Sequence, residues 1–121
     1  EYPEFLGGIA AADLVLDSIG FSGGATTLDA LSVGTPVVTL EGEFMRGRQT
    51  AAMLRLLEAD ELIAGDIDAY VEIAVALCGD RSRREALRKR LLQNVGRLFE
   101  STAVMPALEA FLQRVARDAA R

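Results

Sequence analysis

Residues 21–42 read FSGGATTLDALSVGTPVVTLEG, in which a glycine pair, a threonine pair and an acid stand ahead of an apolar run that follows a proline. That run, TPVVTL at 35–40, and an earlier one, DLVLDS at 13–18, are short, rich in Val, Leu and Thr, and bounded by Gly, Pro and Asp, as strands are. Residues 25–33 between them have helical spacing. A strand, a helix and a strand in this order predict a parallel pair joined by a right-handed crossover. Neither strand alternates apolar with polar residues, which is typical of strands covered on both faces.

Helices are predicted for most of the remaining chain. A short helix is expected at 2–11, and after Gly42 the chain looks helical almost to its end. Four apolar stripes, which we interpret as core packing, fall at residues 46–59, 66–78, 83–95 and from about Met105. Asp66 is the expected N-cap of the second of these helices. Since a two-stranded parallel sheet is seldom a stable domain, residues 1–121 are expected to be the C-terminal part of a larger α/β sheet from a longer chain.

Composition excludes several classes of function. Of the 121 residues, half are hydrophobic and a quarter are charged, as in a folded globular domain. No apolar run approaches the roughly 20 residues of a membrane span, and the acidic start lacks the basic region of a signal peptide, so we expect a cytoplasmic protein without a membrane partner. The net charge of −5 argues against nucleic acid as a partner. Histidine is absent, which removes the commonest general base and zinc ligand, and no two acids look like a metal pair.

Two local features have both a structural and a functional interpretation. The segment DRSRREALRKR at 80–90 carries six basic residues. We interpret it as a solvated helix face, because no aromatic residues interleave for base stacking; a basic patch for phosphate or a polypeptide is the alternative. Cys78 is the single cysteine, which fits a reducing compartment. It falls in the apolar run EIAVALC and is predicted to be a buried structural thiol.

The glycine pair stands where α/β proteins bind ligands. The loop at 18–24 follows the carboxyl end of the first strand and opens a helix at about Ala25, and ligands of open α/β sheets sit at that edge. A helix N-terminus offers unpaired N–H groups and a partial positive charge, which suit a phosphate. Gly23 and Gly24 have no Cβ, so a diphosphate could approach the backbone closely. The P-loop lysine and the G-x-G-x-x-G pattern are both missing, which excludes a P-loop and disfavours a dinucleotide fold.

The polar side chains after the glycines fit a ligand site or a plain turn. Thr26 and Thr27 would add hydroxyl donors in the first turn of the helix. Asp29 repels phosphate but could accept hydrogen bonds from the vicinal diol of a ribose. In the alternative interpretation, Asp29 only favours the helix N-terminus electrostatically. The chemistry of these residues leaves both interpretations open.

A longer pattern resembles a known enzyme family. Residues 12–48, ADLVLDSIGFSGGATTLDALSVGTPVVTLEGEFMRGR, followed by DELIAGDIDAYVEIAVAL at 60–77, resemble the C-terminal end of the O-linked N-acetylglucosamine transferase family, glycosyltransferase family 41. The spacing from GG-x-T-T-x-D-A-L to G-x-P-V-V-T-L carries the resemblance, which covers roughly residues 8–101. It is strongest with the bacterial members that follow tetratricopeptide repeats.

The resemblance implies a fold and an activity. The fold would be part of the nucleotide-sugar-binding lobe of a GT-B (Rossmann-like) enzyme, with short parallel strands followed by a helical tail. The activity would be inverting, metal-independent transfer of N-acetylglucosamine from UDP-N-acetylglucosamine to Ser or Thr of proteins. The general base and the acceptor groove would lie upstream, so this fragment would hold no catalytic residue and would be inactive alone. A non-catalytic interaction module on the same scaffold and a GT-B-type nucleotide-sugar epimerase are the alternatives, and an uncovered sheet edge predicts self-association of the fragment.

The resemblance also implies roles for single residues. The donor-binding set would be Gly23, Gly24, Ala25 and Thr26 near the diphosphate, with Asp29 on the ribose. Arg48 matches an arginine that we expect to hold its loop. Three features depart from the family pattern: Ala25 replaces a threonine, which removes one hydroxyl, SIGFS at 18–22 replaces the usual proline–aromatic loop, and Ser32 stands where tryptophan is common.

Overall fold

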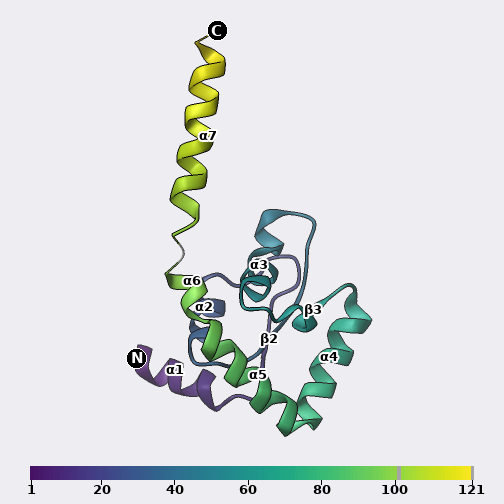
Figure 1. Ribbon diagram of the computed structural model, residues 1–121. Coiled ribbons are helices and arrows are strands. Elements are labelled where there is room, and N and C mark those ends of the chain that lie inside the picture. The colour runs from purple at the N-terminus through teal and green to yellow at the C-terminus, as the bar shows by residue number, and fades with distance from the viewer. Residues whose placement is uncertain (101, 121) are drawn as a thin grey trace.

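A computed structural model describes residues 1–100 and 102–120 of the chain (Figure 1). The elements in chain order are α1 (Tyr2–Ala11), β1 (Val15–Leu16), α2 (Ala25–Ser32), β2 (Val37–Leu40), the 3-10 helix η1 (Met45–Gly47), α3 (Gln49–Leu56), the 3-10 helix η2 (Asp60–Leu62), β3 (Ile63–Ala64), α4 (Ile67–Gly79), α5 (Arg81–Asn94), α6 (Gly96–Phe99) and α7 (Val104–Ala119). The protein is therefore of the predicted α/β class, with short strands followed by a helical tail. Across the described part of the chain, no helix combines the length and the apolar character that crossing a membrane requires.

The strands form a three-stranded parallel sheet in the order β1-β2-β3. Val15 pairs with Val37 and Leu16 with Val38, so the predicted parallel pair with α2 between its strands is confirmed. The third strand is a correction, because the sequence predicts only helices after Gly42. Two residues are too few to show a periodicity, and β3 exists because its backbone pairs with Thr39 and Leu40 of β2.

The core surrounds the central strand. Val37 and Val38 of β2 are completely buried, as strands covered on both faces should be. Helices α3 and α4 contact the sheet, and α5 packs against α2 and α4. The turn between α2 and β2 fits closely against α5. There, Gly34 has φ +78°, and a Cβ added to it would lie 2.8 Å from the Leu92 Cγ.

The two local features noted above differ from their predictions. Cys78 is exposed, so the prediction of a buried thiol is wrong. Leu77 occupies the covered face of α4, and Cys78, the next residue, lies on the exposed face. The prediction that the basic residues of α5 form a solvated face is wrong in part. Arg84 donates to the carbonyls of Leu77 and Cys78 and pairs with Asp13 at 2.9 Å, which fastens α5 to α4 and to the chain before β1.

The predicted core stripes also need correction. The sequence predicts a stripe of Ala52, Met53, Leu56 and Leu57 for α3. Leu57 is buried and Met53 is partly buried, but Ala52 and Leu56 are exposed. The buried residues within the helix are instead Thr50, Ala51 and Leu54. Helix α7 extends away from the body of the protein (Figure 1) and buries no residue. Its apolar stripe is about half exposed throughout, at Leu108, Phe111, Leu112 and Val115. The stripe in α7 is therefore not packed in the core of the described chain.

Candidate functional site

Two loops lie against each other at the carboxyl ends of β1 and β2. The backbone N–H of Ser22 donates to the carbonyl of Arg46 at 2.8 Å. The Ser22 Oγ also donates to that carbonyl and accepts from the N–H of Gln49 at 3.1 Å. Residues 17–24 after β1 and residues 41–48 after β2 are thus joined through Ser22, and together they face the start of α2.

The N-terminus of α2 is open to a ligand. Gly24 is its N-cap, and within residues 1–100 and 102–120 no side chain caps the helix. Ala25 and Thr26 in the first turn are exposed, and a Cβ on Gly24 would meet only the Gln49 Oε1, at 3.2 Å. The structure thus brings together Gly24, Ala25 and Thr26 at an uncapped helix end, which is suited to an anion. Thr27 faces the other way, because it is buried with its Oγ1 3.0 Å from the Thr50 Oγ1.

Both backbone polar groups of Gly23, its N–H and its carbonyl, are hydrogen-bonded within the protein. Its N–H donates to the Asp17 Oδ1 at 2.7 Å, and its carbonyl accepts from the Thr50 hydroxyl at 3.3 Å. The N–H of Gly23 is therefore already used within the protein, and what this residue offers a ligand is close approach. Packing requires a glycine here, because an added Cβ would lie 2.5 Å from the Thr27 Oγ1.

Asp17 organises this loop, and the sequence reasoning missed it. The residue is buried, with 7% of its surface exposed, and its second carboxylate oxygen accepts from the Thr39 hydroxyl at 2.7 Å. Its carbonyl accepts from the Tyr70 hydroxyl at 2.8 Å, and burial, followed by the charge of Asp17, raises the pKa of Tyr70. The available signal was an acid directly after an apolar strand, at the ligand-binding edge of a parallel sheet.

Asp29 lies one turn into α2 with one oxygen already bonded. The Tyr2 hydroxyl donates to the Asp29 Oδ1 at 2.6 Å, and this hydrogen bond raises the pKa of Tyr2. The Asp29 Oδ2 has no hydrogen-bond donor in the described part of the chain. Asp29 can therefore accept a hydrogen bond from one ligand hydroxyl while it keeps the bond from Tyr2. To accept from two ligand hydroxyls, it would have to lose the bond from Tyr2.

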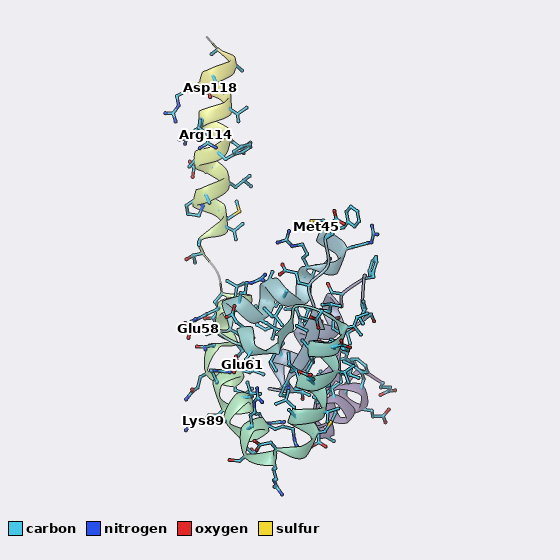
Figure 2. The ribbon with its side chains drawn as sticks, turned by 90° about the vertical axis from the view of Figure 1, so that its right-hand side faces the viewer. Met45, Glu58, Glu61, Lys89, Arg114 and Asp118 are labelled. Carbon is cyan, nitrogen blue, oxygen red and sulfur yellow. The ribbon has the colours of Figure 1, made fainter. Side chains whose placement is uncertain are left out.

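Arg48 holds its loop, as the sequence predicted. Its Nε lies 3.0 Å from the Glu41 Oε1, and the Arg55 Nη2 lies 2.5 Å from the Glu41 Oε2. The hydrogen bond from Arg55, and then that from Arg48, lowers the pKa of Glu41 to about 2. An open hollow of about 350 Å³ adjoins this loop and is lined by Met45, Arg48, Gln49 and Ala52. Figure 2 shows Met45 at the outer end of the loop.

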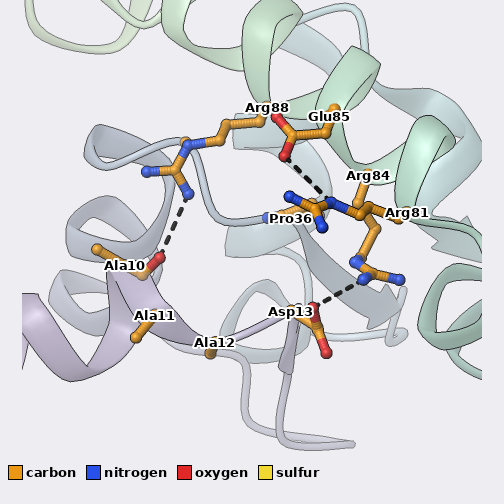
Figure 3. Close-up of a pocket in the computed structure, with 10 residues that line it drawn as sticks. Ala10, Ala11, Ala12, Asp13, Pro36, Arg81, Arg84, Glu85 and Arg88 are labelled. Atoms are coloured by element: carbon orange, nitrogen blue, oxygen red, sulfur yellow. Dashed lines mark hydrogen bonds and ion pairs between the residues drawn. The ribbon is translucent and has the colours of Figure 1, made fainter.

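A second cavity, of about 280 Å³, lies at the opposite, amino ends of the strands (Figure 3). Three arginines of α5 line it, but each already has a protein acceptor. Arg84 pairs with Asp13, Arg81 lies 4.0 Å from Glu85, and Arg88 donates to the carbonyl of Ala10 at 3.3 Å. Arg84 and Arg88 fasten α5 to its neighbours and Arg81 pairs within α5, so the uncapped glycine turn is the better candidate for an anion site. Among the described residues, no three His, Cys, Asp or Glu side chains are grouped so that they could hold a metal ion.

Comparisons with known proteins agree with the resemblance. The model of glycosyl transferase family 41 matches residues 6–105. A UDP-N-acetylglucosamine–peptide N-acetylglucosaminyltransferase of Giardia intestinalis is 35% identical over 89 residues, which are 74% of this chain and 6% of that protein. A probable enzyme of the same name, SPINDLY of Hordeum vulgare, is 34% identical over 65% of this chain and 8% of its own length. A solved structure of a mutant O-GlcNAc transferase from Thermobaculum terrenum matches 95% of this chain and 22% of its own, with a TM-score of 0.73 and 34% identity. The chain thus spans less than a tenth of the two curated relatives.

Proposed function

This chain belongs to glycosyltransferase family 41, and we propose that it is the C-terminal part of the donor-binding lobe of a longer, inverting, metal-independent glycosyltransferase. The donor would be UDP-N-acetylglucosamine, and the acceptor would be Ser or Thr of a protein bound by upstream regions. The names of the relatives support this donor and the peptide acceptor. The observation that carries the proposal is the uncapped N-terminus of α2 at the carboxyl edge of the sheet.

The geometry of this helix end fits a diphosphate leaving group. The free N–H groups and the partial positive charge of α2 would stabilise the negative charge that develops on UDP as the sugar is transferred, without a cation. Gly24 would allow the phosphate oxygens to approach, and the exposed hydroxyl of Thr26 would donate a further hydrogen bond. Ala25 would contribute only its backbone N–H.

Asp29 would hold the ribose. It lies on the helix that receives the diphosphate, about one turn further along, and its Oδ2 is free to accept a ribose hydroxyl. Accepting the second hydroxyl would require the Tyr2 hydroxyl to move from the Oδ1. Tyr2→Phe should therefore leave UDP affinity unchanged or raise it, whereas Asp29→Ala should lower it.

Calorimetric titration of the full-length protein with UDP, GDP and free diphosphate tests the proposal. Asp29→Ala should cost about 1–3 kcal/mol of UDP binding and Thr26→Val about 0.5–1.5 kcal/mol, the usual losses for a charged and a neutral hydrogen bond. Asp68→Ala, which removes an exposed acid from the first turn of α4, is the matched control and should bind as the wild type does. An Asp29→Ala protein that binds UDP and glycosylates normally would show that the glycine segment is only a turn. UDP binding without any transfer by the full-length protein would instead favour a non-catalytic module.

A further inference from the structure

Asp17 connects the sheet to the backbone that precedes α2. Its two carboxylate oxygens accept at 2.7 Å from different elements: the N–H of Gly23 in the loop and the hydroxyl of Thr39 in the central strand β2. Thr39 is completely buried and pairs with Ile63 of β3, so it is a fixed point of the sheet. The position of the Gly23 N–H is thereby set relative to β2.

The far side of Gly23 is fixed by a second chain of hydrogen bonds. The Thr50 hydroxyl donates to the Gly23 carbonyl, which leaves Thr27 as the donor to the Thr50 Oγ1. Thr50 and Thr27 are both buried, so this chain ties α3 and α2 to the same glycine. Gly23 directly precedes the N-cap Gly24, so its orientation sets how the chain enters α2 and where the first N–H groups of the helix lie.

Burial without a cation suggests that Asp17 has a role beyond general packing. None of the ion pairs in the described part of the chain involves Asp17, although the residue is buried, with only 7% of its surface exposed. Burying an ionised carboxylate is unfavourable unless hydrogen bonds compensate, and an apolar residue at the same place would avoid that cost. What an apolar residue cannot do is accept from the Gly23 N–H and the Thr39 hydroxyl together.

We propose that Asp17 is a positioning residue of the donor site, which acts through Gly23 to aim the N-terminus of α2 at the donor diphosphate. The inference rests on the proposed function, because it assigns to Asp17 the geometry of that same site. Both carboxylate oxygens are engaged by protein donors, so Asp17 would act on the ligand only through Gly23.

Three variants of the full-length protein separate positioning from general stability. Asp17→Ala removes both acceptors, whereas Asp17→Asn can still accept from Gly23 with its oxygen and donate to Thr39 with its amide. Tyr70→Phe is the matched structural control, because it removes the hydroxyl that bonds the Asp17 carbonyl and leaves the carboxylate contacts intact. Urea denaturation first sets conditions under which every variant is folded, and calorimetry then measures UDP affinity.

Asp17→Ala should weaken UDP binding about tenfold or more, the change expected for one lost hydrogen bond to a charged group. Asp17→Asn and Tyr70→Phe should stay within about threefold of the wild type, a difference below one hydrogen bond. Wild-type affinity in Asp17→Ala would overturn the inference. An equal loss of affinity in Tyr70→Phe would also overturn it, because the effect would then follow stability alone.

Amide hydrogen exchange at Gly23 gives a readout that does not need a nucleotide. The Gly23 N–H should be protected in the wild type and in Tyr70→Phe, and should lose about tenfold or more of its protection in Asp17→Ala. If the wild type binds neither UDP nor diphosphate, the proposed function is wrong, and this exchange still decides whether Asp17 holds the loop. Unchanged protection in Asp17→Ala would mean that it does not.

Discussion

Replacing Gly23 with alanine should destabilise the protein through a single steric contact. The added Cβ would lie 2.5 Å from the Thr27 Oγ1, about 1 Å inside ordinary van der Waals contact. Thr27 cannot move freely, because it is 2% exposed and its hydroxyl is bonded to Thr50. Relief of the clash therefore requires either a shift of α2 or loss of the Thr27–Thr50 hydrogen bond.

The magnitude follows from three contributions. Overpacking a buried site costs about 1–3 kcal/mol, and a lost neutral hydrogen bond costs about 0.5–1.5 kcal/mol. Alanine has fewer conformations than glycine in the unfolded chain, which stabilises the folded protein by about 0.4–1 kcal/mol. This gain applies at position 23 because Gly23 does not have a positive φ. We expect a net loss of about 0.5–4 kcal/mol in the free energy of unfolding.

Urea denaturation followed by circular dichroism measures this loss. Gly24→Ala is the matched control, because its Cβ meets only the end of the flexible Gln49 side chain, and it should stay within about 1 kcal/mol of the wild type. Adding Thr27→Ala to Gly23→Ala removes the clashing atom, so the two changes should cost less together than the sum of their separate costs. The reasoning is refuted if Gly23→Ala is as stable as the wild type, or if both glycine variants lose the same amount.

Three further predictions concern other parts of the chain. Because Arg55 lowers the folded pKa of Glu41 to about 2 from an ordinary value of 4.5, the stabilisation from ionised Glu41 is complete above about pH 4.5 and is lost as the pH falls toward 2. Glu41→Gln should thus be less stable than the wild type by up to about 1 kcal/mol at pH 7 in urea denaturation, with a difference that shrinks toward pH 2; a constant difference would contradict this. Gly34→Ala should lower the free energy of unfolding by about 2 kcal/mol or more, because φ is +78° and the Cβ meets Leu92, and a stabilised variant would disprove the strain. Phe111→Ser, on the exposed stripe of α7, should change the free energy of unfolding of residues 1–100 by less than about 0.5 kcal/mol, and a larger loss by the same assay would mean that α7 packs against the body.

Much of the first half of the fold could be predicted because its signals are local. Two continuous apolar runs that flank a short helix allow little other than a parallel pair with a crossover, and the structure has that pair. Asp66 was recognisable as an N-cap from its neighbours alone, and its Oδ1 accepts from the N–H of Ala69 at 2.8 Å. The placement of Gly24, Ala25 and Thr26 at the start of α2 follows from the same local reading.

Elements that depend on a distant partner were not predictable in this way. Strand β3 is two residues long and is defined by its pairing with β2, so no window of sequence around it carries the signal. The apolar stripe of α7 shows which face avoids water, but not what would cover that face. The prediction for Cys78 was wrong for the same reason. Composition shows that α4 is apolar, but only packing selects which side of the helix is buried.

The candidate site also has features that follow from local sequence and features that depend on distant partners. That bare backbone, a helix N-terminus and an acid meet at one edge of a parallel sheet could be predicted without a structure, because these features depend on chain direction and short spacing. Which polar groups remain free for a ligand depends on how the packed loops and helices use them. The N–H of Gly23 is bonded to Asp17 and the hydroxyl of Thr27 to Thr50, while the helix end between them stays open. The Thr27–Thr50 hydrogen bond joins side chains 23 residues apart and forms only after α2 and α3 have packed, so no local pattern records it. The Gly23–Asp17 bond spans six residues, but it depends on the path that the loop takes from β1 to α2.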